Sequence, residues 1–134
     1  MKTTFVDTSY WIALLREKDA LHEQAVAWQG RVSGRLITTE YVLVELADAL
    51  CSPAVRAATK SAIELIQGSA SIVVIPASSA LMNEGLALFD SRRDKAWSLT
   101  DCISFVIMWR DGLDEALTSD HHFEQAGFRA LLRV

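Results

Sequence analysis

Four acidic residues stand at positions where carboxylates can gather in an α/β protein: Asp7, Glu45, Asp101 and Asp120. Asp7 and Asp120 directly follow short β-favouring runs, and Asp101 opens an apolar helical segment. Glu45 lies in the first turns of a helical pattern that follows another β-favouring run. In an open parallel sheet, strand ends and the N-termini of the following helices share one rim, so we expect these side chains to converge there.

Carboxylates that meet at one rim repel each other, and partial burial increases the repulsion. Such a cluster is most easily kept when it binds a hard divalent cation, so Mg²⁺ is the expected cofactor, with Mn²⁺ as an alternative. We expect Asp7 and Asp101 to be direct ligands, and Glu45 and Asp120 to hold a second ion or its waters. The corresponding reaction is hydrolysis of a phosphodiester by a metal-activated water, which leaves a 5′-phosphate and a 3′-hydroxyl.

Each carboxylate also has a purely structural interpretation. Asp7 and Asp120 stand where helix N-caps are expected, and Asp101 follows Ser98 at capping-box spacing. Glu45 lies roughly opposite an apolar stripe of its helix and can belong to a solvated face. Taken singly, these interpretations are the simpler ones, but they leave the placement of all four acids at one rim unexplained.

Strand and helix patterns alternate along the chain. The expected strands cover residues 3–6, 36–38, 71–75, 116–118 and 128–134, the last of them at a sheet edge. Helices are expected at 10–16, 21–34, 40–50, 54–67, 78–91 and 100–110, with a short one ending at 126. This alternation predicts a parallel sheet with helices on both faces. The helix at 100–110 is apolar nearly all round and should lie in the core.

Composition sets the class of protein. The chain has 134 residues, 51% of them hydrophobic, which fits a single globular domain spanning 1–134. A net charge of −4 argues against a basic nucleic-acid-binding domain, so a polyanion would need a local patch or metal ions.

No apolar run is long enough for a membrane span or a signal peptide, which predicts a cytoplasmic protein. Both cysteines, Cys51 and Cys102, are expected to be buried thiols.

Four segments of the chain together resemble a known family. They are Phe5-Val6-Asp7-Thr8-Ser9, the run 38–45 (TTEYVLVE), the run 94–104 (DKAWSLTDCIS) and the run 117–128 (LTSDHHFEQAGF). In this order and within this length, they resemble the PIN-domain ribonucleases, and among them the VapC-type toxins of toxin–antitoxin pairs. The resemblance implies a three-layer α/β/α domain with a five-stranded parallel sheet and an acidic metal site made by the four carboxylates. It also implies an endoribonuclease that forms a homodimer and is inhibited by a cognate antitoxin protein.

Hydroxyl groups flank the predicted metal ligands. Thr8, Ser9 and Ser119 are expected to hydrogen-bond the carboxylates, their waters or a substrate phosphate. Helix capping is the alternative role for these residues.

A short basic stretch precedes Asp101. Arg92, Arg93 and Lys95 are candidates for contacts with RNA phosphates, and Trp97 for stacking on an unpaired base. The alternative is a solvated loop with a buried tryptophan.

Rival functions remain at this point. His121 and His122 could act as acid and base without metal, although adjacent side chains are expected to point in different directions. A PIN-like module that binds RNA or protein without cleaving would keep the same acids. A phosphatase or a DNA nuclease would also need clustered acids, but a phosphatase with an Asp nucleophile wants a second Asp close after the first, where Thr8 and Ser9 stand.

Overall fold

Five parallel strands form the centre of the computed structural model, which describes residues 2–133. The strands are β1 (Thr3–Val6), β2 (Arg35–Thr39), β3 (Ile72–Ile75), β4 (Glu115–Leu117) and β5 (Arg129–Ala130). Their order in the sheet is β3-β2-β1-β4-β5. The predicted five-stranded parallel sheet is therefore confirmed, with the C-terminal strand at an edge.

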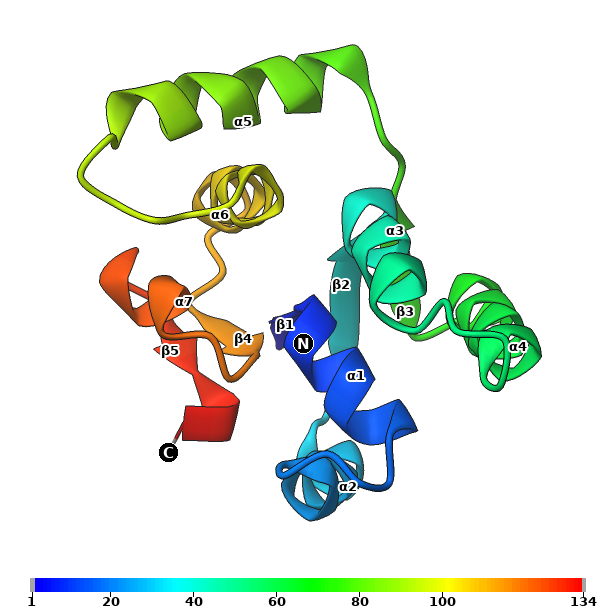
Figure 1. Ribbon diagram of the computed structural model, residues 1–134. Coiled ribbons are helices and arrows are strands. Elements are labelled where there is room, and N and C mark those ends of the chain that lie inside the picture. The colour runs from blue at the N-terminus through cyan, green and yellow to red at the C-terminus, as the bar shows by residue number, and fades with distance from the viewer. Residues whose placement is uncertain (1, 134) are drawn as a thin grey trace.

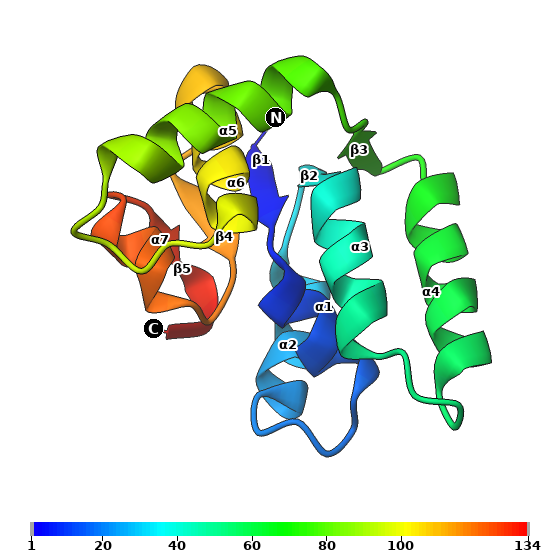
Figure 2. The same cartoon turned by 45° about the horizontal axis from the view of Figure 1, so that its top comes forward.

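Helices cover both sides of the sheet. They are α1 (Thr8–Leu15), α2 (His22–Arg31), α3 (Glu40–Ala49), α4 (Arg56–Gly68), α5 (Ser79–Ser91), α6 (Leu99–Arg110) and α7 (His121–Gln125). In Figure 1, α5 and α6 stack above the sheet and α2 lies below it. Figure 2 shows α3 and α4 running side by side next to the β3 end of the sheet. The arrangement confirms the predicted three-layer α/β/α fold.

The strand order determines where along the sheet a ligand-binding crevice opens. After β1, the chain builds outward through β2 and β3, and then returns to lay β4 against the other side of β1. Neighbouring strands whose connections leave in opposite directions open a crevice at their carboxyl ends, where ligands of open α/β sheets bind. In this fold the crevice lies between the ends of β1 and β4.

The core is centred on α6, as its all-round apolar sequence predicts. Phe105 is fully buried and packs edge-on against Trp97 and Phe123, with ring centroids 5.0 and 4.9 Å apart. Gly85 of α5 allows the close contact with α6, because a Cβ at that position would lie 2.3 Å from Cγ1 of Ile103. The helix α6, which carries Asp101, and the helix α5, after which the basic stretch follows, are thus held in one packed unit.

The chain end differs from the prediction. A strand was expected over 128–134, but β5 has only two residues and continues into a 3₁₀ turn, Leu131–Arg133; residue 134 lies outside the described part. The physical reason is that both leucines of the turn are buried, and the N–H of Leu132 donates to the carbonyl of Thr118 at 3.1 Å instead of extending the sheet.

Two smaller points concern burial and membrane spans. Cys102 is buried as expected, but Cys51 is exposed at the end of α3, so the prediction of two buried thiols is half wrong. Within residues 2–133, no helix has both the length and the apolar character that crossing a bilayer requires.

Candidate functional site

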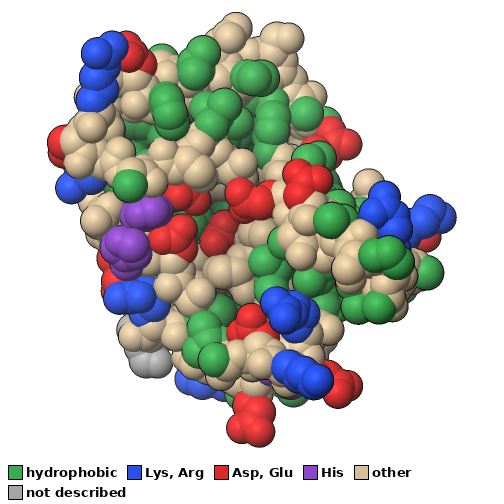
Figure 3. Space-filling view, viewed as in Figure 1, with side chains coloured by type: hydrophobic (Ala, Val, Ile, Leu, Met, Phe, Trp, Pro, Cys, Tyr) green, Lys and Arg blue, Asp and Glu red, His purple; other side chains and the backbone are tan. Residues whose placement is uncertain are grey.

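A hollow of about 360 Å³ opens at the carboxyl ends of β1 and β4. Its lining includes all four predicted carboxylates: Asp7, Glu45, Asp101 and Asp120. In Figure 3, acidic side chains gather near the middle of this face, beside the histidines, while most lysines and arginines lie at its periphery. The structure therefore brings the four acids together, and their role as ligands stays a prediction.

Asp7 is the most deeply placed of the four. It follows β1 directly and caps the start of α1, and its side chain is 4% exposed. Its Oδ2 accepts hydrogen bonds from Thr118 Oγ1 at 2.8 Å and from Ser9 Oγ at 3.0 Å. The two hydroxyls are themselves 3.1 Å apart. This network ties the ends of β1 and β4 to one carboxylate.

Burial raises the pKa of Asp7 from 3.8 to about 7. This pKa already includes the hydrogen bonds from Thr118 and Ser9, which oppose the effect of burial, and the negative charge of Asp101, which adds to it. A cation in the hollow would reverse the balance, because it favours the ionised carboxylate. Asp7 is thus an acid whose charge is costly unless a positive partner is present.

Asp101 occupies the first turn of α6. The capping-box interpretation is correct: Ser98 Oγ accepts from the Asp101 N–H at 3.0 Å, and the Asp101 carboxylate accepts from the Ser98 N–H at 3.3 Å. The carboxylate also lies 3.1 Å from His122 Nδ1. Burial and then the charge of Asp120 raise the pKa of Asp101, and the hydrogen bond with His122 opposes them. One side chain therefore caps the helix and faces the hollow.

Asp120 is the N-cap of α7. Its Oδ1 accepts from the His122 N–H at 2.9 Å, and its own N–H donates to Thr118 Oγ1 at 3.0 Å. His121 and His122 do not point in different directions, as the sequence led us to expect: their ring centroids are 4.4 Å apart. Both imidazoles lie beside the Asp120 carboxylate.

Glu45 reaches the hollow from α3. The Thr8 hydroxyl donates to Glu45 Oε1 at 2.5 Å, which links α3 to the first residue of α1. The side chain is half-buried and lines the hollow with Ala49 one turn further along. The alternative of a simple solvated face therefore does not describe its position.

The hydroxyls flanking the acids were only partly foreseen. Thr8 and Ser9 contact the carboxylates, whereas Ser119 contributes its backbone N–H, which donates to Ser9 Oγ at 3.0 Å. Thr118 and His122 were missed as contacts of the acids. Thr118 could have been found from its place directly after β4, which matches the place of Asp7 after β1, but the sequence pattern assigned it to the strand.

The basic stretch is largely neutralised by its own neighbours. Arg92 pairs with Asp94 at 3.0 Å and Arg93 with Asp90 at 2.6 Å. Lys95 Nζ lies 3.9 Å from Asp94. The pKa of Asp94 is lowered by its hydrogen bond with Arg92. Arg93 is exposed, Arg92 and Lys95 are half-buried, and each of the three already has an acidic partner.

Trp97 is the buried tryptophan of the alternative interpretation, and the stacking role predicted for it is wrong. The side chain is 4% exposed, its Nε1 donates to Gln125 Oε1 at 2.9 Å, and its ring packs on Phe105. The guanidinium of Arg92 lies 5.1 Å from the ring centroid and covers it. A base cannot stack on a ring enclosed in this way, so Trp97 belongs to the core.

The donor set of the hollow fits a hard divalent cation. Four carboxylates from separate elements line it, two of them with raised pKa values, and its other polar side chains are hydroxyls and the His122 imidazole. Oxygen ligands of this kind are those that Mg²⁺ and Mn²⁺ prefer. The chemistry such a site supports is hydrolysis of a phosphate ester.

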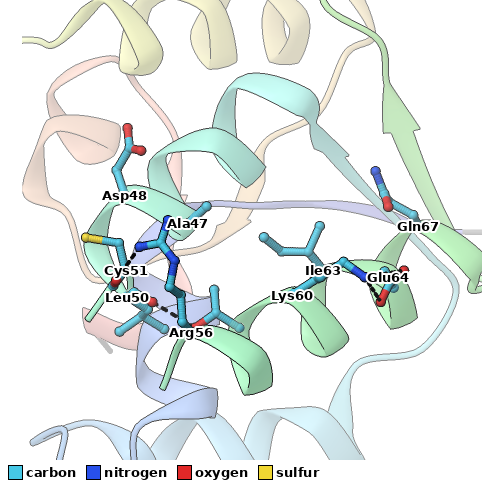
Figure 4. A pocket seen from close by; sticks show the side chains of 10 residues that line it. Ala47, Asp48, Leu50, Cys51, Arg56, Lys60, Ile63, Glu64 and Gln67 are labelled. Carbon is cyan, nitrogen blue, oxygen red and sulfur yellow. Dashed lines mark hydrogen bonds and ion pairs between the residues drawn. The ribbon is translucent and has the colours of Figure 1, made fainter. Parts of the chain in front are cut away.

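A larger hollow of about 590 Å³ lies elsewhere, between α3 and α4 (Figure 4). Its charged groups do not converge on one point. Lys60 contacts Glu64 at 3.4 Å, and Arg56 Nη1 donates to the Cys51 carbonyl at 2.7 Å. Leu50 and Ile63 supply its apolar lining. Without converging acids, this hollow suits an apolar segment of a partner better than a metal ion.

Comparisons with known proteins agree with this geometry. A family model for the PIN domain matches residues 4–129. The 23S rRNA-specific endonuclease VapC20 of Mycobacterium tuberculosis is 30% identical over 127 residues, which are 92% of this chain and 94% of that protein. The crystal structure of VapC20, described as a sarcin–ricin loop cleaving toxin, has a TM-score of 0.86 at 27% identity and covers 93% of this chain and 95% of that one. FitAcB from Neisseria gonorrhoeae shares the fold, with a TM-score of 0.63 at 16% identity over 95% of this chain and 94% of that one.

Proposed function

The chain belongs to the PIN-domain family, and from that premise we propose that it is a Mg²⁺-dependent endoribonuclease, the toxin of a toxin–antitoxin pair. The observation that carries this proposal is the convergence of four carboxylates in one hollow at the switch point between β1 and β4. The relative VapC20 acts on 23S rRNA, so ribosomal RNA is the first substrate to test.

Asp7 and Asp101 are the residues we assign as direct Mg²⁺ ligands, with Glu45 and Asp120 holding a second ion or its waters. When bound, Mg²⁺ supplies charge neutralisation at the phosphate and lowers the pKa of a coordinated water. Mn²⁺, which accepts the same oxygen ligands, is expected to substitute.

The side chains around the acids fix their orientation. Thr118 and Ser9 both donate to Oδ2 of Asp7 and so fix the orientation of its carboxylate. Thr8 holds Glu45, and the capping box holds Asp101. Preorganised ligands lose little freedom when the ion and the phosphate bind, which is the main contribution a protein makes to such a site.

The test is cleavage of a structured RNA pool that includes ribosomal RNA, with Mg²⁺, with Mn²⁺ and with a chelator. Cutting that leaves 5′-phosphate ends, needs the metal and is lost in Asp101→Asn supports the proposal. RNA binding without metal-dependent cutting, by protein free of antitoxin, would contradict it and favour a PIN-like binding module.

Two partners complete the proposal. The cognate antitoxin is expected to dock in the hollow between α3 and α4, where Leu50 and Ile63 offer an apolar floor. A second copy of the chain is expected at α5, where Met82, Leu86 and Phe89 form a half-exposed apolar stripe. The place of action we propose is the cytoplasm, where the RNA substrate is found.

A further inference from the structure

Two imidazoles beside the acidic hollow have no role in the proposed mechanism. The Nδ1 atoms of His121 and His122 lie 3.7 and 3.3 Å from the same oxygen, Asp120 Oδ1. The ligand atoms of these three residues all lie within 4.8 Å of one another. In Figure 3, histidine side chains lie at the rim of the acidic cluster; the His121 side chain is 56% exposed and that of His122 is 19% exposed.

The spacing of these atoms matches a metal-ion site. Two ligand atoms that bind one Zn²⁺ at about 2.0–2.1 Å lie about 3 to 3.5 Å from each other. The observed 3.3 Å between His122 Nδ1 and Asp120 Oδ1 falls in this range. The 3.7 Å of His121 is slightly wider, but that side chain is 56% exposed and can turn toward the ion.

The chemistry of the ligands differs from that of the oxygen-lined centre. Imidazole nitrogen suits Zn²⁺ and Ni²⁺, whereas carboxylates and water suit Mg²⁺. We propose that Asp120, His121 and His122 bind a divalent transition-metal ion of the Zn²⁺ class, at a position beside the Mg²⁺ site. Water completes the coordination, because the Asp120 and His121 side chains are both partly exposed.

This position shares one residue with the proposed nuclease centre. An ion held by the two histidines engages Asp120 and draws it away from the Mg²⁺ site. His122 Nδ1 also lies 3.1 Å from Asp101, so its binding to an ion removes that contact. Insofar as the proposed nuclease function holds, Zn²⁺ is then an inhibitor of Mg²⁺-supported cleavage.

Binding is tested first, without reference to activity. Zn²⁺ is titrated into the full chain by calorimetry, and Co²⁺ is used as a visible-absorption probe of the ligand set. His121→Ala is expected to weaken Zn²⁺ binding by about tenfold or more and to reduce the Co²⁺ absorption. The matched control is His22→Ala, because His22 is the third histidine of the chain and lies on α2, with Nδ1 2.8 Å from the Ala13 carbonyl. Equal affinities of the His121→Ala protein and the wild type would overturn the proposal.

Inhibition separates this inference from the function on which it rests. In the wild type and in His22→Ala, Zn²⁺ is expected to suppress Mg²⁺-dependent cleavage, and His121→Ala should need about tenfold more Zn²⁺ for the same effect. Histidine-dependent Zn²⁺ binding in a protein that never cuts RNA would leave the metal position standing and refute the nuclease. Mg²⁺-dependent cutting together with unchanged Zn²⁺ binding in His121→Ala would support the nuclease and refute the Zn²⁺ position.

Discussion

Asp7 shows how a single residue couples stability to ligand binding. Its carboxylate is almost fully buried, and its pKa is raised to about 7, so the metal-free protein holds a proton that a cation must displace. We therefore expect the affinity for Mg²⁺ or Mn²⁺ to rise by about tenfold per pH unit below pH 7 and to level off above it. Calorimetric titrations with Mn²⁺ at pH 5.5, 6.5, 7.5 and 8.5 would measure this. An affinity that is flat across this range would show that Asp7 is not a ligand.

The raised pKa of Asp7 also predicts how the stability of the folded state changes with pH. The folded pKa of Asp7 lies above its ordinary value of 3.8, so the folded state loses stability as the pH rises through about 7. Asp7→Asn keeps an oxygen acceptor for Thr118 and Ser9 and removes the buried charge. At pH 8 it should raise the unfolding free energy of the metal-free protein by about 2–4 kcal/mol. At pH 4 the gain should nearly vanish.

Urea unfolding at both pH values, in the presence of chelator, measures this difference. The control is Asp48→Asn, an exposed aspartate of α3, which should change the unfolding free energy by less than about 0.5 kcal/mol at either pH. Destabilisation of Asp7→Asn at pH 8 would contradict the raised pKa. Metal should stabilise the wild type and fail to stabilise the variant.

Thr118 is the residue that the sequence did not reveal, and its hydroxyl can be tested directly. It donates to Asp7 at 2.8 Å and accepts from the Asp120 N–H at 3.0 Å. Thr118→Val should raise the pKa of Asp7 further and weaken metal binding by about 10- to 100-fold, because an orienting hydrogen bond is lost. Thr118→Ser keeps the hydroxyl and should retain most of the affinity.

A buried threonine far from the hollow provides the comparison. Thr59 of α4 donates to the Leu50 carbonyl at 2.9 Å, so Thr59→Val should cost stability without changing metal affinity. If Thr59→Val and Thr118→Val weakened metal binding equally, the effect of Thr118 would be on the fold as a whole. Manganese affinity and unfolding free energy of the three variants separate the two cases.

At the scale of elements, the contact between α5 and α6 sets the position of Asp101. Gly85→Ala places a methyl group 2.3 Å from Cγ1 of Ile103, which α6 can accommodate only by shifting. We expect a loss of about 1–3 kcal/mol in unfolding free energy. Gly30→Ala in α2, where nothing lies within 4 Å, should instead gain about 0.5–1 kcal/mol.

Thermal and urea unfolding of both variants measure these changes, and a repacked double variant tests the cause. Ile103→Ala removes the Cγ1 atom that the new methyl group would meet, so Gly85→Ala should cost less unfolding free energy in the Ile103→Ala background than in the wild type. Similar behaviour of Gly85→Ala and Gly30→Ala would mean that helix propensity alone, not the close contact, decides the outcome.

The elements were predictable where local chemistry marks them. The β-favouring run before Asp7, the Ser98–Asp101 capping pair and the all-round apolar α6 each carry their own signal, and the fold follows from their alternation. The 3₁₀ turn at Leu131 was not predictable, because a contact with distant Thr118 ends the strand. Burial of Trp97 was likewise decided by packing on Phe105, which no local pattern shows.

The candidate site likewise has features that the sequence marks and features that only the folded chain determines. Strand ends and helix starts share a rim, so the meeting of Asp7, Asp101 and Asp120 could be expected from topology. The pairing of Arg92 with Asp94 and the approach of His122 to Asp101 depend on side-chain directions that only the folded chain defines. Residue types therefore predicted which acids meet in the hollow better than they predicted the groups that hold or neutralise those acids.

At the scale of the whole molecule, charge distribution raises the question of how an RNA is held. The net charge is −4, and the cations of the basic stretch already pair with Asp90 and Asp94. A polyanion meets repulsion at the acidic hollow unless divalent ions occupy it. Substrate binding and metal binding should therefore be coupled, so that RNA affinity falls when the chelator is added.

Assembly is the second property of the whole molecule. Met82, Leu86 and Phe89 recur at helical spacing on α5 and are each 47–48% exposed. Exposed apolar stripes of this kind mark protein contacts, and a second copy of the chain can bury the same stripe by two-fold symmetry. Leu86→Lys would place two charges in that contact and should convert a dimer to a monomer.

Sedimentation velocity over a range of protein concentrations measures this change. The matched control is Leu65→Lys on α4, where a leucine is 76% exposed but lies outside the stripe, and the dimer should persist. Monomer formation by both variants would indicate nonspecific loss of association, and a dimer that survives Leu86→Lys would place the contact elsewhere. Because the acidic hollow lies at the carboxyl ends of the strands and not on α5, monomeric Leu86→Lys should still bind Mn²⁺ with the affinity of the wild type.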